Sequence, residues 1–315
     1  MGDRPLSSTN RWLRTRSRVA LTAAAALATT GIAVAGPAAA LPASASVTVT
    51  SHFVFTSDSA NTSADSAYLV NGATNKRPDD LLFVTPNFTP GGLCPCLYEP
   101  AAIGVWYDTG TREWAAFRED KATMTAGESF NVLVVPRSSK SVFVQRATTA
   151  NIAGNFTLIN SKLTNGNPRA ELQVTQSFDP GGKGGTYNPH PVGVGYDRSR
   201  KRWAIINEDR APMTVGAAFN VMVGQAPSNG GKSSVLTTTR SNQDGDTTLI
   251  SNSQTTGNPN NVVFVTQNWN PGGKGSTYNN AQTGIWYTGT REGAFNEDHS
   301  HTPLKSAFNI LVFSS

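Results

Sequence analysis

Three copies of one series of motifs fill most of this chain, and this repetition constrains its fold more than any other feature. Many landmarks keep one order and one spacing, which chance does not explain. Each copy is large enough for a core of its own, so we expect three tandem domains of about ninety residues. The landmarks, which return after 89 to 91 residues, are Pro90-Gly91-Gly92, Tyr98, Gly104, Glu119-Asp120 and Phe130-Asn131.

Each copy has the pattern of short β-strands. Residues 81–85, 103–107, 114–117 and 130–135 are rich in branched and aromatic side chains and are bounded by turn formers. After residue 45, no long stretch combines helical periodicity with capping residues. We therefore predict an all-β protein of three tandem, small antiparallel β-sandwich or barrel units. The predicted domains, joined by short polar segments, are residues 46–136, 137–225 and 226–315.

A hairpin in the middle of each copy is predicted from a difference in length. Tyr107 and Glu119 are twelve positions apart, whereas their counterparts in the third copy, Tyr287 and Glu297, are ten apart. Losing two residues keeps a hairpin in register if each arm gives up one. We expect two paired strands here, with the turn near residues 109–111 in the first copy.

The first 45 residues predict an export signal. Four arginines between residues 11 and 18 precede an apolar run from Val19 to Ala35, and small residues follow. Cleavage is expected after Ala43-Ser44-Ala45, with Ala38-Ala39-Ala40 as the alternative site. The other interpretation is a retained membrane anchor, but the run is short and made of weakly apolar alanine. Because paired arginines are missing, we favour the general secretory route and a secreted, extracellular protein.

Removal of this segment changes the charge of the protein. The whole chain has a formal net charge of +5. Residues 1–45 hold five arginines and one aspartate, a net +4, and subtracting this leaves +1 for the rest. A chain so close to neutrality has no overall field to attract nucleic acid. No later segment is apolar enough to span a membrane. The expected partners are extracellular or cell-surface polysaccharide or protein, and no cofactor is expected.

The aromatic strand of each copy supplies the main candidates for ligand contact. Successive strand residues face opposite sides, so Val105 and Tyr107 share one face and Trp106 lies on the other. Gly195 and Trp286 stand where the other copies align with Trp106. A position that accepts Trp or Gly is not a tightly packed core position. We expect Trp106 and Trp286 to be exposed or to lie between copies. The further aromatic candidates are Trp114, Trp203 and Trp269.

Acidic pairs follow a strand in every copy and are candidates for cation binding. Hard cations such as calcium prefer clustered carboxylate and carbonyl oxygens. In the alternative interpretation, which we favour, the aspartate closes a turn and the glutamate faces water. His299 and His301 follow the third pair and could extend a metal site there. The candidate ligands are Glu119, Asp120, Glu208, Asp209, Glu297, Asp298, His299 and His301.

The cysteines and histidines indicate no catalytic plan. Cys94 and Cys96 flank a single proline and predict a local disulfide or two idle thiols. None of the four histidines recurs in all three copies, and no nucleophile-elbow or zinc-protease motif occurs. We predict that the protein is not an enzyme. The alternatives are a purely structural or interaction module, in which the units stack with tryptophans between them, and a secreted hydrolase built around His190 or around His299 and His301.

The motifs also resemble a known family. They are clearest in the second copy, over residues 175–182, 187–194, 203–209 and 216–221. This series is similar to a domain of unknown function that occurs, often in tandem, in secreted bacterial proteins. The first copy departs from it with Cys94-Pro95-Cys96. The resemblance implies export, a β fold and modular use, and it carries no activity over to this chain.

Overall fold

The computed structural model describes residues 48–182, 184–224, 230–251, 253–275 and 277–314. The predicted export signal lies outside these residues. The described chain is all-β, as predicted, and its only helical elements are two single 3₁₀ turns, η1 (Pro90–Gly92) and η2 (Pro271–Gly273).

The twenty-one strands of the described residues fall into three sets of seven, one set for each copy. We call these sets repeats 1, 2 and 3. Repeat 1 contains β1 (Ser51–Thr56), β2 (Thr62–Ser63), β3 (Ser66–Tyr68), β4 (Leu81–Pro86), β5 (Ile103–Asp108), β6 (Glu113–Arg118) and β7 (Ser129–Val135). Repeat 2 contains β8 (Val142–Arg146), β9 (Ile152–Ala153), β10 (Phe156–Leu158), β11 (Leu172–Ser177), β12 (Val192–Asp197), β13 (Arg202–Asn207) and β14 (Ala218–Val223). Repeat 3 contains β15 (Lys232–Thr237), β16 (Gln243–Asp244), β17 (Thr247–Leu249), β18 (Val262–Asn268), β19 (Thr283–Tyr287), β20 (Glu292–Asn296) and β21 (Ala307–Phe313).

Each repeat is a small sandwich of two antiparallel sheets. In repeat 1 a three-stranded sheet, β1-β7-β4, covers a four-stranded meander, β2-β3-β6-β5, and repeats 2 and 3 have the same order. Side chains from both sheets meet in one core, which in repeat 1 includes Phe55, Val105, Trp114 and Phe130. Repeats 2 and 3 have equivalent cores of their own.

A fourth core is shared by all three repeats. Phe83 of repeat 1, Met222 of repeat 2 and Phe264 of repeat 3 all belong to this cluster. The middle strands β7 and β21 are buried along their whole length. Alternate residues of such a strand face the core of their own repeat and the shared core, which explains their unbroken apolar runs. The repeats therefore pack against one another and are not independent beads.

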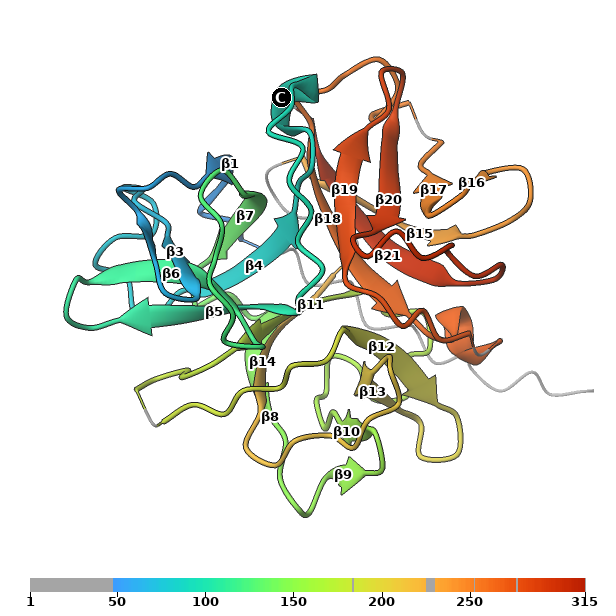
Figure 1. Ribbon diagram of the computed structural model, residues 1–315. Helices are drawn as coiled ribbons and strands as arrows, with labels where there is room; N and C mark the ends of the chain where they lie inside the picture. Colours follow the sequence, from blue (N-terminus) through green and yellow to red (C-terminus); the bar gives the residue numbers. More distant parts are fainter. Residues whose placement is uncertain (1–47, 183, 225–229, 252, 276, 315) are drawn as a thin grey trace, which may run out of the picture. The chain divides into compact units, whose positions relative to one another are not determined.

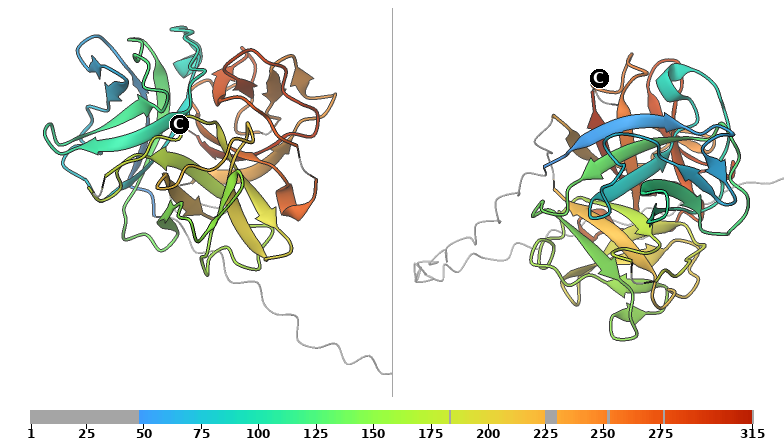
Figure 2. Two further views of the ribbon diagram at one scale, coloured as in Figure 1. Left: turned by 60° about the horizontal axis from the view of Figure 1, so that its bottom comes forward. Right: turned by 90° about the vertical axis from the view of Figure 1, so that its left-hand side faces the viewer.

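The repeats are joined in a closed cycle. β5 pairs in parallel with β11, and β12 pairs in parallel with β18. The cycle is closed by a parallel bridge between Asn87, just after β4, and Ile285 in β19. Figure 1 shows the three sets of strands side by side, and the turned views of Figure 2 agree.

The central hairpins have the predicted register. β5 and β6 end on the pair Asp108 and Glu113, whereas β19 and β20 end one residue earlier on each arm, at Tyr287 and Glu292. The two-residue deletion in repeat 3 therefore shortens both strands equally and leaves the facing of every side chain unchanged.

Candidate functional site

The long segment between the two sheets of each repeat crosses to the preceding repeat. We call residues 87–102, 178–191 and 269–282 the crossing loops. Each begins with a backbone bond to the neighbour: Phe178 N donates to Val105 O at 3.0 Å, Trp269 N to Val194 O at 2.8 Å and Phe88 N to Ile285 O at 2.9 Å. We call the three resulting boundaries seam 1 (repeats 1 and 2), seam 2 (repeats 2 and 3) and seam 3 (repeats 3 and 1).

A buried glutamate fastens every seam. Glu119 Oε2 accepts the Asn188 backbone N–H at 2.9 Å, Glu208 Oε2 accepts that of Asn279 at 3.2 Å, and Glu297 Oε2 accepts that of Glu99 at 3.0 Å. Burial raises the pKa of each of the three glutamates to about 8. The expectation that these glutamates face water is therefore wrong, because their carboxyl groups are used between repeats.

The recurring glycines leave room for these carboxyl groups. A Cβ on Gly104 would lie 2.5 Å from Glu119 Oε1. The same contact would be shorter still for Gly193 against Glu208 and for Gly284 against Glu297. A methyl group cannot fit at such distances, so the glycine and the glutamate of each repeat form one structural unit.

The aspartates of the acidic pairs close turns, as we favoured. Asp120 accepts the Ala122 N–H at 2.9 Å, and Asp209 and Asp298 make the same bond two residues on. Among the described residues no group of three or more His, Cys, Asp or Glu could hold a metal ion. In every pair the aspartate binds a turn amide of its own repeat, whereas the glutamate binds an amide of a neighbouring repeat. The acidic pairs therefore join repeats.

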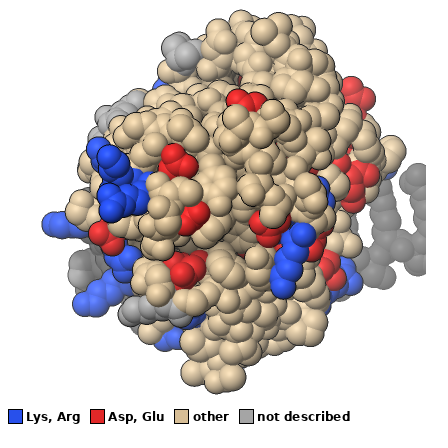
Figure 3. Space-filling view, turned by 60° about the vertical axis from the view of Figure 1, so that its left-hand side comes forward, with Lys and Arg blue, Asp and Glu red and all other residues tan. Residues whose placement is uncertain are grey.

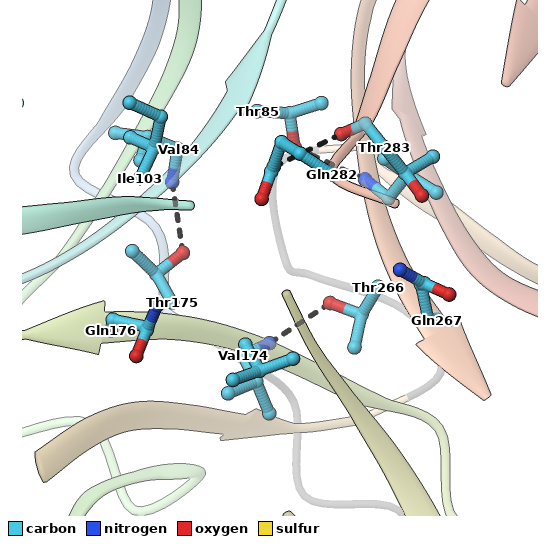
Figure 4. A pocket seen from close by; sticks show the side chains of 12 residues that line it. Val84, Thr85, Ile103, Val174, Thr175, Gln176, Thr266, Gln267, Gln282 and Thr283 are labelled. Carbon is cyan, nitrogen blue, oxygen red and sulfur yellow. Dashed lines mark hydrogen bonds between the residues drawn. The ribbon is translucent and has the colours of Figure 1, made fainter. Parts of the chain in front are cut away.

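A ring of threonines lies where the three repeats meet (Figure 4). Thr175 Oγ1 accepts the Val84 N–H at 3.1 Å, Thr266 Oγ1 accepts that of Val174 at 3.0 Å, and Thr85 Oγ1 accepts that of Val265 at 3.2 Å. The space between them is about 30 Å³. A space of this size holds a few water molecules at most and is far below the roughly 300 Å³ of small-ligand sites.

The asparagines of the Phe-Asn motifs add a third cycle of bonds. Asn131 donates to Val263 O, Asn220 donates to Leu82 O and Asn309 donates to Leu172 O, at 2.8 to 3.0 Å. Each of these side chains is buried and reaches a neighbouring repeat. Their recurrence is therefore explained by assembly of the three repeats.

Each seam also holds an aromatic pocket at the surface. A phenylalanine or tryptophan and a tyrosine from the crossing loop face the meander of the preceding repeat. Seam 1 is lined by Asp65, Trp106, Phe117, Phe178 and Tyr187. Seam 2 is lined by Phe156, Gly195, Tyr196, Asp197, Arg198, Ala204, Ile206, Trp269, Asn270 and Tyr278. Seam 3 is lined by Phe88, Tyr98, Asp246, Thr247, Trp286 and Phe295.

In seams 1 and 3 a tryptophan from the aromatic strand occupies much of the pocket. Trp106 and Trp286 are half-buried, and their indole N–H groups donate to Ser66 Oγ and Thr247 Oγ1, both at 3.1 Å. The remaining cavities have volumes of about 100 Å³ in seam 1 and about 210 Å³ in seam 3.

Seam 2 is built differently. Gly195 takes the place of the strand tryptophan, and Trp269 from the crossing loop takes the place of Phe178. A Cβ on Gly195 would lie 2.6 Å from Ile206 Cδ1 and 3.1 Å from Trp269 Cε3. The cavity that remains has a volume of about 330 Å³ and mostly apolar walls. It is the one of the three that reaches the size of small-molecule sites, which begins at about 300 Å³.

A lysine, an arginine or a histidine side chain lies against the seam tyrosine of each repeat. Lys121 Nζ lies 4.3 Å from the centre of the Tyr187 ring, Arg210 Cζ lies 4.6 Å from that of Tyr278, and the His299 ring is 3.9 Å from that of Tyr98. On the face shown in Figure 3, charged side chains form only small scattered groups among uncharged residues.

The remaining candidates lie elsewhere. Trp114 and Trp203 are 3% and 0% exposed, and they belong to the cores of repeats 1 and 2. Their N–H groups donate to the carbonyl oxygens of Arg77 and Asn167. Rings that are enclosed in this way cannot contact a ligand, so the prediction that Trp114 and Trp203 bind a ligand is wrong.

The candidate histidines and cysteines form only pairwise contacts in the described residues. His190 Nδ1 lies 2.5 Å from Asp209 Oδ2, and the two side chains are each 23% exposed. His299 lies 3.6 Å from Asp246, whereas His301 is exposed. Cys94 and Cys96 are joined in a disulfide within a crossing loop.

The repeat arrangement agrees with a comparison against protein families. The chain matches the Domain of unknown function (DUF7452) three times in tandem, over residues 40–134, 104–223 and 201–312. The chain belongs to this family. Comparisons with curated proteins and with solved structures give no match. Seams 1 and 2 lie where consecutive copies of the DUF7452 domain meet, and seam 3 lies between the third copy and the first. In the described part of the chain, no helix has the length and apolarity needed to cross a membrane.

Proposed function

We propose that this protein is a non-catalytic binding protein that acts outside the cell and holds a sugar residue in the seam 2 cavity. The observation that carries the proposal is the opening at Gly195. There, Tyr196, Trp269 and Tyr278 line a cavity of about 330 Å³, while tryptophans occupy the equivalent space in the other seams.

The chemistry of this cavity suits a saccharide. One face of a pyranose ring carries C–H groups that pack on aromatic rings, and its edge carries hydroxyl groups. Four aromatic residues, Phe156, Tyr196, Trp269 and Tyr278, line seam 2, and Asp197 and Arg198 supply polar groups. Pockets of mainly apolar walls with a few placed polar groups are the usual form of small-ligand sites.

Support for a non-catalytic role comes from the use of the recurring polar groups. The glutamates, threonines and asparagines that repeat in all three copies bind backbone groups of a neighbouring repeat. Their recurrence is accounted for by assembly, so a shared catalytic plan is not needed to explain it. Action outside the cell is supported by the predicted export signal in residues 1–45.

The proposal is tested by an array of cell-wall and extracellular polysaccharides, followed by calorimetry on the best binder. Gly195→Trp fills the cavity and Trp269→Ala removes its main wall, so both should abolish binding. Trp106→Phe in seam 1 is the matched control and should bind as the native protein does. Equal binding by all three variants, or no saccharide bound by the native protein, would overturn the proposal.

A second function, as a purely structural module, is favoured by seams 1 and 3. Trp106 and Trp286 lie between repeats with their indole N–H groups already bonded, which is how a packing residue is used. In that case acrylamide should quench the fluorescence of these two residues poorly, and their replacement should change stability without changing any binding.

A further inference from the structure

Charge distinguishes seam 2 from the other seams as clearly as size does. In seam 1 the pocket is lined by Asp65, and in seam 3 by Asp246. The residue at this position in repeat 2 is Asn155, whose amide donates to the Tyr278 hydroxyl at 3.3 Å. The first two pockets thus present a carboxylate to whatever enters them, and seam 2 presents a neutral amide in its place.

The one acid that lines seam 2, Asp197, already forms an ion pair with an arginine outside the cavity. Asp197 Oδ1 accepts the backbone N–H groups of Ser199 at 2.8 Å and of Arg200 at 3.0 Å, and Oδ2 lies 2.5 Å from Arg200 Nη1. Burial raises the pKa of Asp197, but the hydrogen bond from the Ser199 hydroxyl at 2.6 Å, together with those from Arg200 and the two backbone N–H groups, outweighs burial and lowers the pKa to about 2. The carboxylate stays ionised and its charge is offset by Arg200.

Among the residues that line the cavity, the remaining charge is that of Arg198. Its side chain lines the cavity and reaches across the seam, since a Cβ on Gly273, at the end of η2, would lie 3.1 Å from Arg198 Cγ and 3.3 Å from Cδ. The stem of the arginine is therefore held at the rim while the residue itself stays exposed. A guanidinium group binds carboxylates through two parallel hydrogen bonds, which favours anionic over neutral ligands.

We propose that the sugar held in seam 2 is an acidic one, with its ring against Trp269 and Tyr278 and its carboxylate bound by Arg198. This inference rests on the proposed sugar-binding function. It adds the ligand class: a uronic acid residue, as found in acidic polysaccharides. The closed seams, lined by an aspartate, would repel the same ligand.

The test compares methyl glucuronide with methyl glucoside, which differ by a carboxylate in place of a hydroxymethyl group. Calorimetry on the native protein should show the glucuronide bound about tenfold more tightly, as expected for one charge-assisted hydrogen-bonded pair. Raised NaCl should weaken glucuronide binding alone. Arg198→Gln should remove the preference, so that the two sugars bind this variant with equal affinity.

Two controls separate this inference from the proposed function. Arg210→Gln removes the same charge from the same seam without altering the residues that line the cavity, and it should keep the preference. Gly195→Trp should abolish binding of both sugars. Equal affinity of the native protein for the two sugars, or equal loss of preference in Arg198→Gln and Arg210→Gln, would overturn the assignment while sugar binding stands. Failure of both sugars, and of tetrasaccharides that contain glucuronate, would overturn both proposals.

Discussion

Seam 2 and its two counterparts use the same backbone joint and differ only in the side chains set into it. All three have a glutamate that binds a crossing-loop amide, a glycine beside that glutamate and a lysine, arginine or histidine side chain against a tyrosine. Seams 1 and 3 add a strand tryptophan whose N–H binds Ser66 or Thr247. Seam 2 has Gly195 and Phe156 at those positions, and it gains Trp269.

The difference shows that the joint tolerates change at its surface because its deeper parts carry the assembly. Four positions change together in seam 2: the acid, the hydroxyl residue, the strand tryptophan and the loop aromatic residue. Each is at the pocket, and the buried carboxyl-to-amide bonds are kept. A repeat can therefore acquire a cavity without losing its neighbour.

The largest expected effect tests what the three seams share. Burial raises the pKa of Glu119, Glu208 and Glu297 to about 8 from an ordinary value of 4.5. A carboxyl group with a raised folded-state pKa contributes its full stability below pH 4.5 and loses it as the pH rises through 8. Unfolding by urea should therefore become easier from pH 5 to pH 9, by up to ~1.4 kcal/mol per pH unit for each group.

The matched variant replaces all three glutamates by glutamine. The amide oxygen can still accept the crossing-loop N–H, and the cost of a buried charge is gone. Its stability should depend on pH much less than that of the native protein. A triple variant with an unchanged pH dependence would show that other groups, such as Glu99 or Glu292, dominate it.

The next effect comes from opening a closed seam. Trp106→Gly and Trp286→Gly each remove a half-buried ring and leave a hydroxyl group without its donor, which should lower the free energy of unfolding by about 2–3 kcal/mol. Urea titration at one pH measures this. A loss below about 0.5 kcal/mol in both variants would mean that these rings contribute little packing.

Filling the seam 2 cavity should lower the free energy of unfolding by a smaller amount, and a second substitution should restore part of the loss. Gly195→Trp forces a side chain against Ile206 and Trp269, which should destabilise the protein by about 1–3 kcal/mol. Adding Trp269→Phe recreates the pairing of seams 1 and 3 and should restore at least ~1 kcal/mol, because the two positions are in contact. Simple additivity of the two changes would contradict this coupling.

The smallest effect concerns the cations over the seam tyrosines. Lys121→Gln and Arg210→Gln should each cost about 0.5–1 kcal/mol, the usual value for an exposed cation–π pair. Similar values at the two positions, from thermal or urea unfolding, would extend the equivalence of the seams to their outer edge. A much larger loss for Arg210→Gln would show that seam 2 depends on its cation.

The fold could be predicted from the sequence because its signals are local and occur three times. Strand composition, turn residues and the shortened hairpin between Tyr287 and Glu297 determine secondary structure and register within one repeat. The seams could not be predicted in the same way. Glu119 meets Asn188 across 69 positions of sequence, and no local pattern indicates that contact.

The close contact between each buried glutamate and its glycine is nevertheless indicated by the sequence. Gly104 and Glu119 recur together in every copy, and an invariant glycine at normal backbone angles suggests a close neighbour. The aromatic candidates divided for a similar reason. Comparison of the copies predicts that Trp106 lies outside the core of its repeat. Residue type alone does not show that Trp114 and Trp203 lie in the cores.

The cyclic order of the seams has a consequence for how such a protein could arise. Every repeat both offers a glutamate to the next crossing loop and presents a loop to the previous glutamate, and repeat 3 reaches back to repeat 1. One unit thus contains both halves of each joint. Three separate chains of a single unit could assemble as a symmetric trimer, and fusing them in one gene would then free each interface to diverge and acquire a ligand of its own.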